Sequence, residues 1–89
     1  MTKAVDVRIT GLVQGVSFRY YTRQQADRLG VTGWVRNEPD GSVTGHFEGP
    51  EPAVDALVDW CGHGPAYADV EGVEVRAAAT SGASTFITG

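Results

Sequence analysis

The chain has 89 residues, 42% of them hydrophobic and 20% charged, which is typical of a soluble domain with one hydrophobic core. Its net charge of −4 disfavours nucleic acid or an anionic membrane as the main partner, because both attract basic surfaces. A single cysteine excludes an intramolecular disulfide, and no apolar stretch predicts a signal peptide or a membrane span. We therefore expect one cytoplasmic domain over residues 1–89.

The N-terminal third predicts a strand followed by a helix. Val5, Val7 and Ile9 alternate with polar residues, which indicates a half-buried strand of about seven residues. A helix is expected over 18–29, with Ser17 as its N-cap and a glycine as its stop. The residues at helical spacing are Phe18, Tyr21, Thr22, Ala26 and Leu29.

A hairpin and a second helix follow. Strands are expected over 31–37 and 43–48, joined by the turn sequence NEPDGS. The second helix opens at GPEP and ends before Gly62, and we expect Cys61 to lie on its buried stripe. His46 falls on the polar phase of its strand, so an exposed histidine is expected there.

A fourth strand around 70–77 completes the order β-α-β-β-α-β, and Phe86 and Ile87 are expected to form a short extra edge strand. This order is typical of the ferredoxin-like split βαβ fold, an α+β class in which two helices cover one face of an antiparallel sheet of four to five strands. In this arrangement the first and third strands are central, and the second flanks the third.

The sequence GLVQGVSFRY at 11–20 connects the first strand to the first helix. Helix N-termini leave backbone N–H groups unpaired, and Gly11 and Gly15 would let the backbone curl into an anion-binding nest. Arg19, in the first helical turn, adds a forked donor suited to phosphate oxygens. A plain turn with a surface arginine is nevertheless the simpler interpretation of the spacing alone.

The sequence GWVRN at 33–37 ends a strand at a turn. Asn37 can both donate and accept hydrogen bonds, so it can hold a water molecule, although its spacing alone favours a turn-forming role. Charge is also distributed unevenly: residues 7–37 carry five arginines and one acid, whereas residues 38–75 carry nine acids and no lysine or arginine. This split favours either a small anion near the first part of the chain or merely a mixed surface.

Taken together, GLVQGVSFR at 11–19 and GWVRNEPDGSVTGHFEG at 33–49 resemble the two signature stretches of acylphosphatases. The similarity extends over nearly the whole chain and includes GPAYADVEGVEV at 64–75. The resemblance implies a monomeric enzyme that hydrolyses acyl phosphates to carboxylate and phosphate, without metal or cofactor.

By this resemblance, Arg19 binds the phosphate and Asn37 orients the attacking water. The backbone N–H groups that would donate to the phosphate are those of Gln14, Gly15, Val16, Ser17, Phe18 and Arg19. The expected partner is a small acyl phosphate, with no nucleic acid and no membrane.

Three other classes remain as alternatives. The first is a non-catalytic anion-binding or regulatory module with a ferredoxin-like fold. The second is a domain like the N-terminal part of hydrogenase maturation carbamoyltransferases, which is disfavoured because no cysteine-rich zinc modules follow. The third, an RNA-binding domain, is disfavoured by the acidic pI of about 4.9. Glu38, beside Asn37, would weaken the approach of an anion unless its carboxylate faces away.

Overall fold

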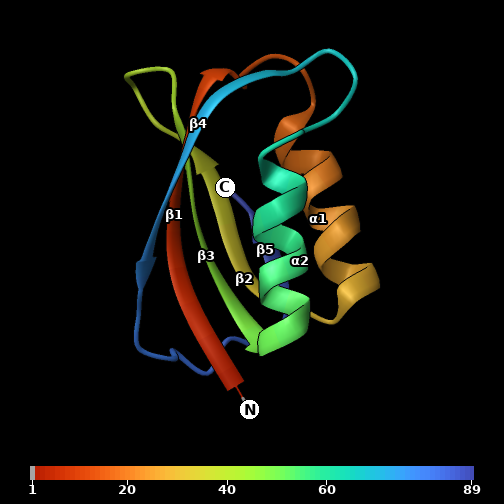
Figure 1. The fold of residues 1–89 in the computed structure, drawn as a ribbon, viewed down its shortest axis with the longest axis vertical. Helices are drawn as coiled ribbons and strands as arrows, with labels where there is room; N and C mark the ends of the chain where they lie inside the picture. Colours follow the sequence, from red (N-terminus) through yellow and green to blue (C-terminus); the bar gives the residue numbers. More distant parts are fainter. Residues whose placement is uncertain (1) are drawn as a thin grey trace.

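A computed structural model describes residues 2–89, and it places two helices on one face of a five-stranded sheet (Figure 1). The elements are β1 (Thr2–Leu12), α1 (Phe18–Leu29), β2 (Thr32–Asn37), β3 (Val43–Pro50), α2 (Glu51–Cys61), β4 (Asp69–Ala77) and β5 (Phe86–Thr88). The predicted ferredoxin-like order is confirmed, and α1 has the predicted bounds. β1 is longer than expected, with 11 residues.

The strand order in the sheet is β4-β1-β3-β2-β5, so β1 and β3 lie near its centre as predicted. The expectation of a wholly antiparallel sheet is wrong, because β5 pairs with β2 in parallel. β4 and β5 lie at opposite edges, so residues 78–85 must cross the sheet (Figure 1, the blue loop at the bottom). The chain then enters β5 from the end at which β2 begins, which makes the two strands parallel.

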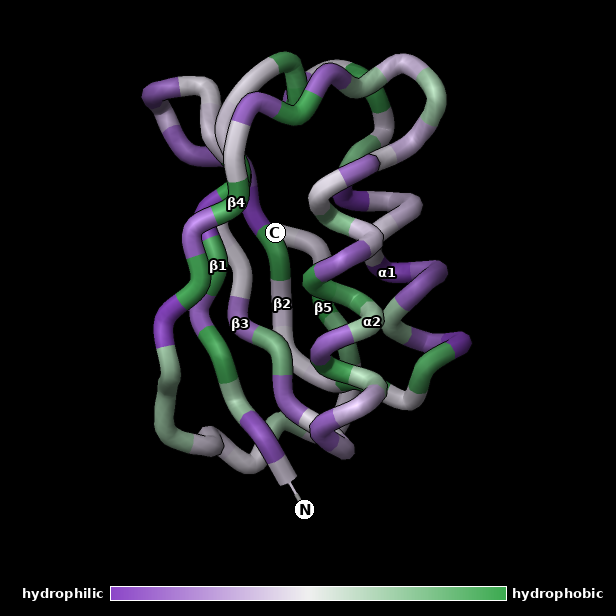
Figure 2. The backbone as a smooth tube through the Cα atoms, viewed as in Figure 1, coloured by the Kyte–Doolittle hydropathy of each residue, from purple (hydrophilic) through white to green (hydrophobic). Residues whose placement is uncertain are grey.

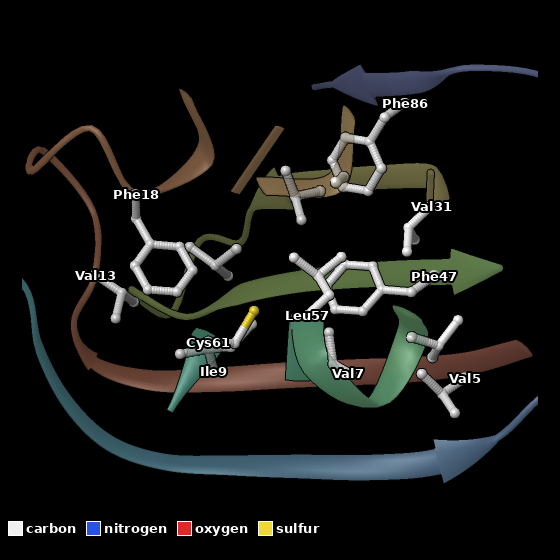
Figure 3. Packing of buried hydrophobic residues seen from close by; sticks show 14 residues of the cluster. Val5, Val7, Ile9, Val13, Phe18, Val31, Phe47, Leu57, Cys61 and Phe86 are labelled. Atoms are coloured by element: carbon white, nitrogen blue, oxygen red, sulfur yellow. The ribbon is translucent and has the colours of Figure 1, made fainter. Parts of the chain in front are cut away.

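The hydrophobic core fills the space between the sheet and the helices (Figure 3). Hydrophobic and hydrophilic residues alternate along β1, as expected for a strand with one buried face (Figure 2). Val54, Leu57 and Cys61 of α2 are fully buried against this core. The burial of Cys61 confirms it as a core residue, and burial raises the pKa of its thiol to about 12.

Helix α1 departs from the predicted pattern at two positions. Ser17 occupies the N-cap position, but its backbone is left-handed (φ 60°) and its side chain makes no capping hydrogen bond. Tyr21 is 42% exposed, whereas Phe18, Thr22 and Ala26 are buried. The buried stripe of α1 is therefore narrower than the sequence indicated.

The outer face of the sheet, opposite the helices, contains a buried polar cluster. The prediction of an exposed His46 is wrong, because only 6% of His46 is exposed. Its Nδ1 lies 2.7 Å from Oδ1 of Asp6, and its Nε2 lies 3.1 Å from Oε2 of Glu48. The carboxylate of Glu48 also accepts hydrogen bonds from the backbone N–H and the hydroxyl of Ser81. The crossing segment 78–85 thus covers the Glu48 end of a face that strand alternation predicts to be open to solvent.

Candidate active site

The loop between β1 and α1 is held at both ends by core residues. Val13 and Phe18 are each 1% exposed, and Figure 3 shows both side chains pointing into the core below the loop. Between them, residues 14–17 form a bend at the surface. Because both ends are fixed by packing, this short segment has little freedom to change shape.

The backbone of the loop turns through two left-handed residues, Gly15 (φ 74°) and Ser17 (φ 60°). Among residues 2–89, Ser17 is the one non-glycine residue with positive φ, a conformation that costs such residues about 1–2 kcal/mol. Within the described chain, no hydrogen bond uses the backbone N–H groups of residues 14–19. A strained turn at a helix N-terminus that leaves N–H groups unpaired is the arrangement that binds anions.

Gly11 does not belong to this turn, although the sequence suggested that it brackets it. It lies in β1 at an irregularity in the pairing with β4, between Thr10 and Gly11. A Cβ atom at Gly11 would meet the main-chain oxygen of Asp69 at 2.2 Å. This glycine therefore permits close strand pairing, and the curl of the loop depends on Gly15.

Arg19 and Asn37, the two predicted catalytic residues, line one cleft of about 660 Å³, which is within the usual range for small-molecule sites. We call it the Arg19 cleft. Its lining residues are Val13, Gly15, Ser17, Phe18, Arg19, Tyr20, Arg23, Gln24, Asp27, Asn37 and Thr88. Residues of the loop between β1 and α1, of α1, of β2 and of β5 thus meet at this place.

The side chain of Gln14 explains how the loop and Asn37 are held together. Its Nε2 donates hydrogen bonds to the main-chain oxygens of Glu38 (2.7 Å) and Ser42 (2.9 Å). Both acceptors lie in the β2–β3 turn, and Asn37 immediately precedes this turn. Sequence reasoning used only the backbone of Gln14, and nothing in the spacing indicates this side-chain contact.

The charges around the cleft are arranged in favour of an anion. Glu38 faces away, because its carboxylate accepts hydrogen bonds from Thr44 Oγ1 (2.6 Å) and Arg36 Nε (2.7 Å) on the outer side of the sheet. These two hydrogen bonds lower the pKa of Glu38, and the one from Thr44 has the larger effect on it. Arg36 stacks over Trp34 and does not line the cleft. Arg23 lines the cleft together with Asp27, to which it lies 3.8 Å away.

The guanidinium of Arg19 is oriented by the last residue of the chain. Its Nη1 donates a hydrogen bond to the main-chain oxygen of Gly89. Gly89 is itself attached to β2, because its N–H donates to the main-chain oxygen of Val35 at 2.7 Å. A guanidinium has five N–H donors, so this contact leaves others available for an anion.

The described residues contain no group of three or more histidine, cysteine, aspartate or glutamate side chains placed to hold a metal ion. Among residues 2–89, no helix is long and apolar enough to cross a membrane. The groups that line the Arg19 cleft include two arginines, Arg19 and Arg23, the amide of Asn37 and the loop that carries the unpaired N–H groups. Such a set can bind a phosphoryl group and position a water molecule beside it.

Fold and site together define a ferredoxin-like α+β domain with unpaired backbone N–H groups at the start of α1, and comparison with known proteins identifies its family. The acylphosphatase family model matches residues 5–88. An acylphosphatase of Nocardioides sp. is 59% identical over 97% of this chain and 87% of its own length. One from Rubrobacter xylanophilus is 59% identical over 91% of this chain and 74% of its own.

A solved acylphosphatase structure from Coxiella burnetii is also similar. It superposes with a TM-score of 0.94 at 32% identity, covering 98% of this chain and 92% of that one. The chain belongs to the acylphosphatase family.

Proposed function

We propose that this chain hydrolyses acyl phosphates, with Arg19 and the backbone of residues 14–19 holding the phosphate and Asn37 holding the attacking water. The observation that carries the proposal is the shared cleft, because Arg19 and Asn37 come from different elements and line it together with Gly15 and Ser17.

In the first step, the phosphoryl oxygens of the substrate accept hydrogen bonds from the loop N–H groups and from the Arg19 guanidinium. The loop is fixed by Val13 and Phe18, so these donors are already oriented before the substrate binds. A preorganised donor of this kind typically contributes about 2.7–4 kcal/mol to stabilising the transition state.

In the second step, a water molecule held by Asn37 attacks the phosphorus atom, and the bond between phosphorus and the acyl oxygen breaks. The leaving group is a carboxylate, which is stable at neutral pH and needs no strong general acid. The proton of the water passes to an oxygen of the phosphate. The products are a carboxylate and inorganic phosphate, so atoms and charge balance without a further reactant.

Gln14 is a positioning residue in this mechanism. Its backbone N–H belongs to the phosphate-binding loop, but its side chain touches neither the substrate nor the water. The two hydrogen bonds of this side chain join the loop to the turn that follows Asn37. We further propose that the enzyme is monomeric and cytoplasmic and needs no metal or cofactor, because Arg19 itself supplies positive charge for the phosphate.

Phosphate release from benzoyl phosphate, with and without a chelator, tests the proposal. We expect turnover that the chelator does not change. We expect Arg19→Gln to lower kcat/KM by on the order of 10²–10³-fold, and Asn37→Ala to lower kcat. The matched control is Arg28→Gln, because Arg28 lies at the exposed C-terminal end of α1 and should leave the rate unchanged.

Thermal unfolding curves must show that all three variants remain folded. Phosphate binding without turnover in the wild type would favour the non-catalytic anion-binding module instead. Full activity of Asn37→Ala would exclude the water-positioning role of Asn37.

A further inference from the structure

A second cleft adjoins the phosphate-binding loop on its other side and is lined mainly by aromatic and apolar side chains. We call it the Tyr67 cleft, and it includes Val16, Tyr21, Trp60, Pro65 and Tyr67. No charged side chain of the described residues lines it, in contrast to the Arg19 cleft. The connection between α2 and β4 forms its far wall and lies near the loop before α1 (Figure 1).

The two tyrosines of this cleft are exposed to solvent. Tyr67 is 84% exposed and Tyr21 is 42% exposed. Trp60 is half-buried and fixed from below, because its ring packs against Phe18 with centroids 5.6 Å apart. A surface that presents several aromatic rings without covering them is typical of a binding site rather than of ordinary packing.

The two clefts share one wall. Gly15 and Ser17, the left-handed residues of the loop, line both of them. Asn37 and Arg19 line only the Arg19 cleft. A phosphate bound by the loop N–H groups therefore lies at the border between a polar cleft and an aromatic cleft.

The geometry of phosphoryl transfer decides where the acyl group lies. The attacking oxygen and the leaving oxygen are roughly in line with the phosphorus atom, on opposite sides of it. Water held by Asn37 attacks from the Arg19 cleft, so the leaving carboxylate and its acyl group point away from Asn37.

We infer that the Tyr67 cleft is the acyl-group subsite and that it favours flat apolar acyl groups such as benzoyl over small ones such as acetyl. The inference rests on the proposed function, since it assumes that the loop binds the phosphate of the substrate. Tyr67, Tyr21 and Trp60 offer aromatic surface to an aryl group, and an acetyl group has much less apolar surface to bury against them.

Substrate selectivity tests the inference. The ratio of kcat/KM for benzoyl phosphate to that for acetyl phosphate is measured in the wild type, in Tyr67→Ser and in Tyr20→Ser. Tyr67→Ser should lower this ratio roughly threefold to tenfold, the usual contribution of one aromatic contact. Tyr20 is an exposed tyrosine, 58% exposed, that lines the Arg19 cleft and touches the Tyr67 cleft only through the packing of its ring against Tyr21, so Tyr20→Ser should lower the ratio less than Tyr67→Ser.

A binding measurement separates this inference from the proposed function, because it needs no turnover. Calorimetry with benzylphosphonate and methylphosphonate should show that wild type prefers the benzyl compound and that Tyr67→Ser loses most of this preference. An unchanged ratio in Tyr67→Ser in both assays would overturn the inference, as would a larger loss in Tyr20→Ser. If neither acyl phosphate is hydrolysed, the proposed function fails, and the phosphonate preference still decides the role of the Tyr67 cleft.

Discussion

Replacing Gln14 with methionine tests the link between the phosphate-binding loop and Asn37. Methionine has nearly the shape of glutamine but cannot donate, so Gln14→Met removes the hydrogen bonds to the main-chain oxygens of Glu38 and Ser42. Each such bond contributes about 0.5–1.5 kcal/mol, so the free energy of unfolding should fall by roughly 1–3 kcal/mol. In a domain of this size, each kcal/mol lowers Tm by about 4–8 °C.

The effect on catalysis should be larger than the loss of stability suggests. Once the link is lost, the turn that follows Asn37 can move relative to the loop. A displacement of about 1 Å at a reacting group can cost on the order of 100-fold in rate. We therefore expect kcat for benzoyl phosphate to fall on the order of 10- to 100-fold, with a smaller change in KM, because the phosphate donors remain in place.

The control is Ser81→Ala, which removes the hydroxyl donor to Glu48 on the outer face of the sheet, away from both clefts. This variant should lose stability but keep kcat, as judged by urea unfolding and phosphate release under the same conditions. A Gln14→Met variant that loses stability but keeps the wild-type kcat would refute the positioning role of Gln14.

Two further predictions concern the loop backbone and the polar cluster. Gly15→Ala and Gly30→Ala both place a Cβ on a left-handed residue (φ 74° and 77°) with no atom in the way, so each should lower stability by about 1–2 kcal/mol in urea unfolding. Only Gly15→Ala should lower kcat/KM. Equal losses of activity in the Gly15→Ala and Gly30→Ala variants would contradict the proposal that the loop before α1 binds the phosphate. In the cluster, the pKa of Glu48 is lowered from 4.5 to about 2, mainly by the hydrogen bond from Ser81. The ionised Glu48 therefore stabilises the fold at neutral pH, and this stabilisation is lost as pH falls from 4.5 toward 2. Burial opposes the charge on His46, but the contacts of His46 with Asp6 and Glu48 outweigh burial and raise its pKa above 6.5. Protonated His46 therefore stabilises the fold at low pH, and this stabilisation is lost as pH rises through the raised pKa. In plots of the free energy of unfolding against pH, Glu48→Gln should reduce the fall at acid pH, and His46→Gln should reduce the fall as pH rises above 6.5. Plots identical to that of the wild type would contradict both predictions.

Local sequence patterns were sufficient to predict most of the fold. The bounds of α1 follow from apolar spacing and the glycine after Leu29, and the β2–β3 hairpin follows from its turn residues. The meeting of Arg19 and Asn37 could be predicted only by resemblance, since spacing alone also allowed plain turns. Once the strand order places β2 beside β3 and β3 beside β1, the ends of these strands lie close together.

Contacts between distant segments could not be predicted from local patterns. The polar phase of β3 indicated an exposed His46, but His46 is buried beside Asp6 and Glu48, and the crossing segment binds Glu48. Alternation carries no information about what lies above a sheet. The parallel pairing of β5 depends on the same crossing. The hydrogen bonds of Gln14 join residues 24 and 28 positions apart, and the sequence contains no signal for them.

The most direct test of the mechanism is hydrolysis of benzoyl phosphate in ¹⁸O-labelled water, followed by mass spectrometry of both products. If water held by Asn37 attacks phosphorus, a single turnover places the label in inorganic phosphate and leaves benzoate unlabelled. Label in benzoate would show that water attacks the carbonyl carbon instead. That result would contradict the assignment of the loop, Arg19 and Asn37 to phosphoryl transfer.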